Sequence, residues 1–94
     1  MYRNKAFLRA VASLPCQLCG REGETQAAHA NWSHYGKGMG MKAHDCFTAA
    51  LCQHCHFAID QGSKMTGEER RDAWEDAFRK TLVALCEAGR LSVK

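Results

Sequence analysis

Apolar residues recur with helical spacing at both ends of the chain. Near the N-terminus they form one stripe, while Lys5 and Arg9 lie on the opposite side, and this pattern predicts a helix over residues 4–13 that ends before Pro15. The stripe consists of Phe7, Leu8, Val11 and Ala12.

A longer apolar stripe predicts a second helix near the C-terminus. Its members are Trp74, Ala77, Phe78, Thr81, Leu82 and Leu85. Thr66 and Glu69 have the spacing of a capping box, so the helix is expected to begin at Thr66 and to end at Gly89. Its apolar face is expected to pack in the core, with Cys86 as a buried thiol.

The middle of the chain contains shorter patterns. The small, weakly alternating residues from Thr25 to Ala30 predict a strand, and Phe47–Leu51 is a short apolar run. A helix is expected from Cys52 to Gln61, because Gly62 follows as a helix terminator.

Glycines alternate with other residues between Tyr35 and Lys42, which predicts an irregular, adaptable loop. Such a loop can bring backbone N–H groups and the ammonium groups of Lys37 and Lys42 to a phosphate. The loop can equally be an ordinary surface loop with no binding role. The spacing of a P-loop is absent.

A chain of 94 residues, taken as one domain over residues 1–94, is near the size at which a structural metal helps to hold the fold. The net charge is +3, and residues 1–42 carry six Lys or Arg against two acids. Four thiolates around one Zn²⁺ would lower the net charge to about +1. This charge permits a DNA partner without demonstrating one.

The most specific chemical signal is a pair of CxxC motifs, Cys16/Cys19 and Cys52/Cys55. Two such pairs far apart in sequence can close one tetrahedral Zn²⁺ site. Disulfides are the alternative, but residues 1–13 contain neither a signal peptide nor a membrane span. We therefore expect a cytoplasmic protein with reduced, metal-binding cysteines.

His56 and Asp60 are four residues apart in the helix predicted from Cys52, so they share a face beside the one that carries the cysteines. One helix can thus hold the zinc and offer an imidazole and a carboxylate to a second cation. In the alternative interpretation, His56 packs against the zinc site and Asp60 is a solvated charge.

The order of these residues resembles the HNH endonucleases of the ββα-metal fold, and more closely the small prophage-encoded HNH-type nucleases. The resemblance rests on residues 16–60, about half of the chain. The residues that carry it are Cys16, Cys19, Ala28, His29, the glycine-rich loop, Asp45, Leu51, Cys52, Cys55, His56, Ile59 and Asp60. It implies an α+β fold: a zinc-stapled β-hairpin and helix with flanking N- and C-terminal helices.

The resemblance also implies roles for individual residues. His29 would be the general base, His56 and Asp60 would hold a catalytic Mg²⁺ or Mn²⁺, and Cys16, Cys19, Cys52 and Cys55 would hold a structural Zn²⁺. Many relatives have Asp or His in place of Ala28, and the middle Asn of the motif has no obvious counterpart. The candidates to orient His29 are Asp45 first, then His44 and Asn31.

The function predicted is a metal-dependent endonuclease that hydrolyses phosphodiester bonds of DNA, including branched or structured DNA, in phage recombination or DNA processing. Lys37 and Lys42 are the predicted nucleic-acid contacts, and a homodimer would allow symmetric cutting of two strands. Two alternatives stay open: a non-catalytic zinc module that binds nucleic acid, and a zinc ribbon that binds another protein.

Overall fold

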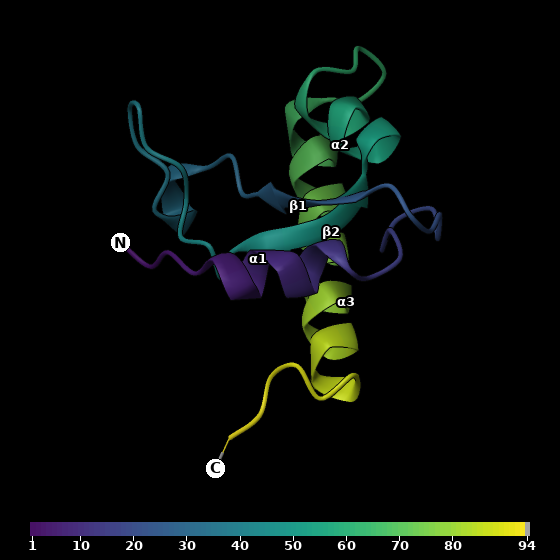
Figure 1. Cartoon of the computed structure of the whole chain (residues 1–94). Helices are drawn as coiled ribbons and strands as arrows, with labels where there is room; N and C mark the ends of the chain where they lie inside the picture. The colour runs from purple at the N-terminus through teal and green to yellow at the C-terminus, as the bar shows by residue number, and fades with distance from the viewer. Residues whose placement is uncertain (94) are drawn as a thin grey trace.

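The structure is a computed structural model and describes residues 1–93. Three α-helices, one short 3-10 helix and two strands follow one another along these residues (Figure 1). In chain order they are α1 (Lys5–Ala12), β1 (Thr25–His29), the 3-10 helix η1 (Ser33–Tyr35), β2 (Thr48–Cys52), α2 (Gln53–Asp60) and α3 (Gly67–Glu87). The order of elements, two antiparallel strands followed directly by a helix, agrees with the α+β fold expected from the amino-acid sequence.

The two strands pair antiparallel, with Thr25 opposite Cys52 and His29 opposite Thr48. Every residue of β2 is buried because α1 and α3 cross the sheet from opposite sides (Figure 1). Ala50 shares a cluster with Val11 of α1 and Leu85 of α3, whereas Ala49 and Leu51 belong to the cluster that includes Trp74 of α3. Small side chains in the strands let both helices approach the sheet closely.

Helix α3 begins as predicted. The Thr66 hydroxyl accepts a hydrogen bond from the Glu69 N–H at 3.1 Å, and the Glu69 carboxylate accepts one from the Thr66 N–H at 2.8 Å. Hydrogen bonds join the helix to both strands: the Trp74 indole N–H donates to the Ala28 carbonyl of β1, and the Ala50 N–H of β2 donates to the Thr81 hydroxyl.

The aromatic residues of η1 and the preceding segment also pack on α3. The Tyr35 ring lies 5.2 Å from Trp74 and 5.1 Å from Phe47, between ring centroids, and Trp32 lies 5.7 Å from Trp74. Tyr35 also donates a hydrogen bond to the Glu75 carboxylate. These contacts anchor one end of the glycine-rich loop to the core.

Two details of the predicted helix faces are wrong. In α1, Ala10 is buried and Ala12 is exposed, so the apolar stripe is rotated slightly from the predicted one. In α3, Cys86 is exposed rather than buried, because it lies one position beyond Leu85 and therefore turns away from the core.

Within residues 1–93, no helix combines the length and the apolar character needed to span a bilayer.

Candidate functional site

Four cysteine sulfurs from three parts of the chain meet at one point. Cys16 and Cys19 lie in the turn after α1, Cys52 ends β2, and Cys55 lies in α2. All four Sγ atoms lie within 4.8 Å of one another. Among the described residues they are the only group of three or more cysteine, histidine or acidic side chains close enough to share a metal ion.

The spacing of these sulfurs fits zinc. A tetrahedral Zn²⁺ with Zn–S bonds of about 2.3 Å holds its sulfurs about 3.8 Å apart, and Cys19 Sγ lies 3.7 Å from Cys52 Sγ. A disulfide requires about 2.05 Å. The two CxxC turns are also alike: the Cys19 N–H points to Cys16 Sγ at 3.5 Å, and the Cys55 N–H points to Cys52 Sγ at 3.4 Å. The cluster is therefore consistent with a structural Zn²⁺ site.

The negative charge of ionised sulfurs in the cluster favours binding of a cation. Burial and the neighbouring sulfurs raise the pKa of the Cys55 thiol, whereas hydrogen bonds to backbone N–H groups overcome burial and lower the pKa of Cys16 to about 6. Four clustered sulfurs cannot all ionise unless their charge is compensated, and Zn²⁺ supplies that compensation. Cys46 and Cys86 lie outside the cluster.

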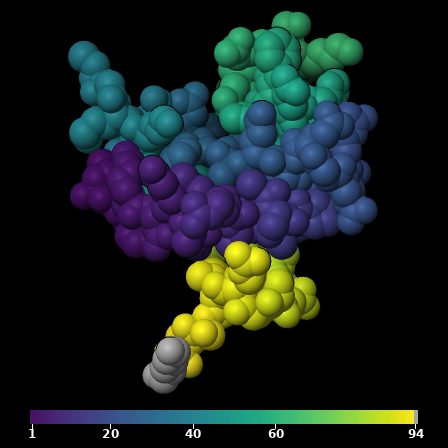
Figure 2. Space-filling view, viewed as in Figure 1, coloured from purple at the N-terminus to yellow at the C-terminus, as the bar shows by residue number. Residues whose placement is uncertain are grey.

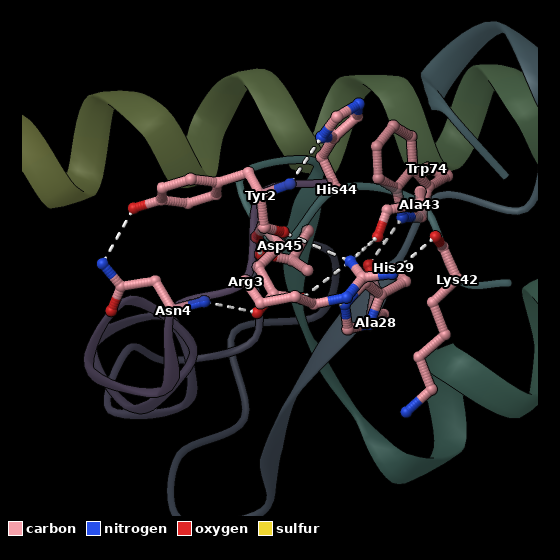
Figure 3. Close-up of polar contacts among 11 residues, drawn as sticks. Tyr2, Arg3, Asn4, Ala28, His29, Lys42, Ala43, His44, Asp45 and Trp74 are labelled. Atoms are coloured by element: carbon pink, nitrogen blue, oxygen red, sulfur yellow. Dashed lines mark hydrogen bonds and ion pairs between the residues drawn. The ribbon is translucent and has the colours of Figure 1, made fainter.

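A second group of polar side chains is centred on Asp45, which is only 4% exposed. His29 Nε2 lies 2.8 Å from Asp45 Oδ1, so the predicted contact between these two residues is present (Figure 3). The Asn4 backbone N–H donates to Asp45 Oδ2 at 2.7 Å, and an Arg3 guanidinium nitrogen lies 3.3 Å from Oδ1. Both carboxylate oxygens are therefore occupied by donors.

These donors keep Asp45 ionised. Burial by itself would raise the pKa of Asp45, but the hydrogen bonds from His29 and the Asn4 N–H and the charge of Arg3 lower it below its ordinary value. A carboxylate only accepts hydrogen bonds, so His29 Nε2 must carry the proton in this contact. When the ring is neutral, its other nitrogen, Nδ1, is therefore a free proton acceptor.

The N-terminal arm, residues 2–4, encloses this group. Arg3 also donates to the carbonyls of Lys42 at 2.9 Å and Ala43 at 2.5 Å, which fixes the end of the glycine-rich loop (Figure 3). His44, a predicted rival of Asp45, is not bonded to His29; its Nδ1 accepts a hydrogen bond from the Tyr2 N–H at 3.0 Å.

His56 and Asp60 lie on one face of α2, as predicted, and His56 Nε2 is 3.0 Å from Asp60 Oδ2. The other ring nitrogen, Nδ1, lies 2.8 Å from the Gln26 amide oxygen and must donate to it. Arg70 donates to the Asp60 carbonyl at 2.9 Å and so satisfies the C-terminal end of α2.

A surface pocket of about 310 Å³ brings the predicted residues together. It lies between β1, the glycine-rich loop and α2. Its polar lining consists of His29, Asn31, Lys37, Lys42, His56 and Asp60, and Ala27 and Ala30 complete it. His34 and His54 are exposed, and neither they nor His44 line this pocket.

No sequence pattern indicated the roles of Arg3, Asn4 and Gln26. Arg3 was only part of a basic N-terminal segment, yet it meets Asp45 across 42 positions of the chain. Gln26 is 30 positions from His56.

The fold and the cysteine cluster define a small α+β protein with a zinc-type four-cysteine site. The chain belongs to the family described as "Protein of unknown function (DUF968)", whose profile matches residues 1–87. No curated protein and no solved structure matches the chain closely enough to indicate a relationship.

Proposed function

We propose that this protein is a metal-dependent DNA endonuclease with an HNH-like site. The observation that carries the proposal is the pocket, which gathers a histidine with a free proton-accepting nitrogen, a histidine–carboxylate pair and two lysines. These are the groups that hydrolysis of a phosphodiester requires: a base, ligands for a cation, and positive charge for the phosphate.

His29 is the general base in this proposal. Asp45 fixes the ring with the proton on Nε2, which leaves Nδ1 to accept a proton from the attacking water. In the hydrolysis step, a bond forms between the water oxygen and phosphorus and the bond from phosphorus to the 3′ oxygen breaks. The proton of the water passes to His29 Nδ1, and the departing 3′ oxygen takes a proton from solvent.

His56 and Asp60 would hold the catalytic cation. Two neighbouring ligands of an octahedral Mg²⁺, at about 2.1 Å from the metal, are about 3.0 Å apart, and this is the separation of His56 Nε2 and Asp60 Oδ2. Gln26 supports the same assignment, because it holds the proton on Nδ1, so the cation would replace the proton that Nε2 donates to Asp60 in the metal-free protein. When bound, the cation supplies positive charge that stabilises the phosphate oxygens and the departing oxygen.

Lys37 and Lys42 would bind the phosphate groups next to the reacting one. Both line the pocket beside His29, and their ammonium groups are free of ion pairs in the described residues. The four-cysteine site takes no part in the chemistry; it holds β2 and the start of α2 in place, and α2 carries His56 and Asp60.

The test is cleavage of supercoiled plasmid by the zinc-loaded protein with and without Mg²⁺ or Mn²⁺. His29→Ala should lower the rate by about 10²–10⁴-fold, the usual contribution of a general base. His34→Ala is the matched control, because His34 is exposed and lies outside the pocket. Equal rates for wild type and His29→Ala would remove His29 from the mechanism, and no cleavage of any DNA would remove the enzymatic function.

One observation favours a second candidate, a non-catalytic zinc module that binds nucleic acid. The only cluster of three or more metal-binding side chains found in residues 1–93 is the four-cysteine site. Calorimetric titration separates the two functions. The nuclease binds one tight Zn²⁺ and one weaker Mn²⁺ that is lost in His56→Ala, whereas the binding module binds zinc alone.

A further inference from the structure

The glycine-rich loop ends in a narrow tip that projects from the body of the molecule (Figures 1 and 2). Gly38 and Met41 face each other and exchange two backbone hydrogen bonds, of 3.3 and 3.0 Å, around the turn Met39-Gly40. Gly40 has φ +71°, which suits the third position of a type II turn and favours glycine there. Met39 at the tip is fully exposed, with a relative exposure of 103%.

The base of this tip is held firmly at both ends. Gly36 has φ +91°, and a Cβ there would lie 2.6 Å from the His44 ring, so the backbone passes close against that ring. On the other side, Arg3 binds the carbonyls of Lys42 and Ala43. A segment fixed in this way loses little conformational entropy when it binds a partner.

The charges around the tip indicate the chemistry of the partner. Lys37 precedes the tip, Lys42 follows it, and both line the same pocket as His29. A phosphate held between these lysines would leave Met39 two residues farther out, about 7 Å of extended chain. An isolated exposed methionine needs no explanation, but Met39 lies between two lysines of the pocket, on a backbone that is held at both ends.

We propose that Met39 is a wedge that enters the minor groove of duplex DNA and inserts between adjacent bases. This inference rests on the proposed function and adds the substrate class: duplexes with a weakly stacked step, at a mismatch or a branch. Proteins that bend DNA use single apolar side chains in this way, and unstacking is least unfavourable where pairing is already weakened. The flexible thioether of methionine adapts to the irregular gap, and Gly40 adds no side chain to a tip that must enter a groove about 6 Å wide.

The test uses the zinc-loaded protein without Mg²⁺ or Mn²⁺, so that binding is measured without cleavage. The probes are two oligonucleotide duplexes that contain 2-aminopurine, one perfectly paired and one with a mismatch next to the fluorescent base. Wild type should bind the mismatched duplex more tightly and raise the 2-aminopurine fluorescence as the base unstacks. Met39→Ala should lose the fluorescence rise and about tenfold of the affinity for the mismatched duplex, the size of one contact to a base.

Two control variants separate the wedge from general effects. Val93→Ala truncates another fully exposed apolar side chain (101%) and should bind both duplexes as wild type does. Lys42→Ala should weaken binding to both duplexes equally and lower the slope of log affinity against log salt by about one.

The outcomes distinguish this inference from the function on which it rests. If wild type cleaves DNA but Met39→Ala keeps the preference and the fluorescence rise, the wedge is refuted and the nuclease function stands. If wild type neither binds nor cleaves DNA, both are refuted.

Discussion

Replacing Asp45 by Asn tests how the candidate base is held. The carboxylate receives the His29 ring and Arg3 at Oδ1 and the Asn4 N–H at Oδ2. An amide has one accepting oxygen, so in either orientation its NH2 group must face a donor that now has no acceptor. A hydrogen bond to a charged group contributes about 1.5–3 kcal/mol, and one such bond is lost. We expect Asp45→Asn to lower the free energy of unfolding by about 2–3 kcal/mol.

Urea unfolding followed by the fluorescence of the buried Trp74 measures this change, in the presence of zinc. Asp72→Asn is the matched control, since Asp72 is exposed and makes no ion pair in the described residues. In parallel, long-range ¹H–¹⁵N NMR of the histidine rings should show the His29 proton on Nε2 in wild type. A loss of stability below about 0.5 kcal/mol, or a neutral His29 with its proton on Nδ1, would refute the reasoning.

Four other predictions follow from the same structure. Removal of zinc, by a chelator or by Cys52→Ser, should largely unfold the protein, as measured by circular dichroism. The reason is that binding of a structural zinc contributes about 10–16 kcal/mol, whereas the total stability of typical domains is only about 5–15 kcal/mol. An unchanged spectrum would contradict a structural role. Thr66→Ala should lower the unfolding free energy by about 1 kcal/mol through loss of the capping box, and Ser63→Ala, exposed nearby, should not. Folding lowers the pKa of Asp45, so the ionised carboxylate stabilises the folded protein above about pH 4, and this stabilisation is lost as the pH falls through the folded pKa. The difference in unfolding free energy between wild type and Asp45→Asn should therefore shrink below about pH 4. Arg3→Gln should lower kcat for plasmid nicking by about tenfold with little change in KM, because Arg3 acts through Asp45 and the loop; an effect on KM alone would assign it to substrate binding instead.

The local features of this fold were predictable because their signals lie within a few residues. The capping box at Thr66, the two CxxC turns and the shared face of His56 and Asp60 each depend on spacings of three or four positions, which backbone geometry fixes. The meeting of the two cysteine pairs was also predictable, because zinc chemistry requires four ligands at one point.

The environment of His29 was only partly predictable. Asp45 was a candidate from the order of residues, but Arg3 and the Asn4 N–H reach it through the path of the N-terminal arm, which no local pattern encodes. The exposure of Cys86 was missed for a related reason. The exact edge of a buried helix face depends on how the helix rotates against its neighbours, and a rotation of a few degrees determines whether a residue at that edge is buried or exposed.

Cys52 has three structural roles: it is the last residue of β2, its sulfur caps the start of α2, and the same sulfur belongs to the four-cysteine cluster. Binding of Zn²⁺ to this cluster would therefore be thermodynamically linked to the order of the segment that carries His56. Loss of the metal would then remove the ordered surface altogether instead of leaving a weakened version of it.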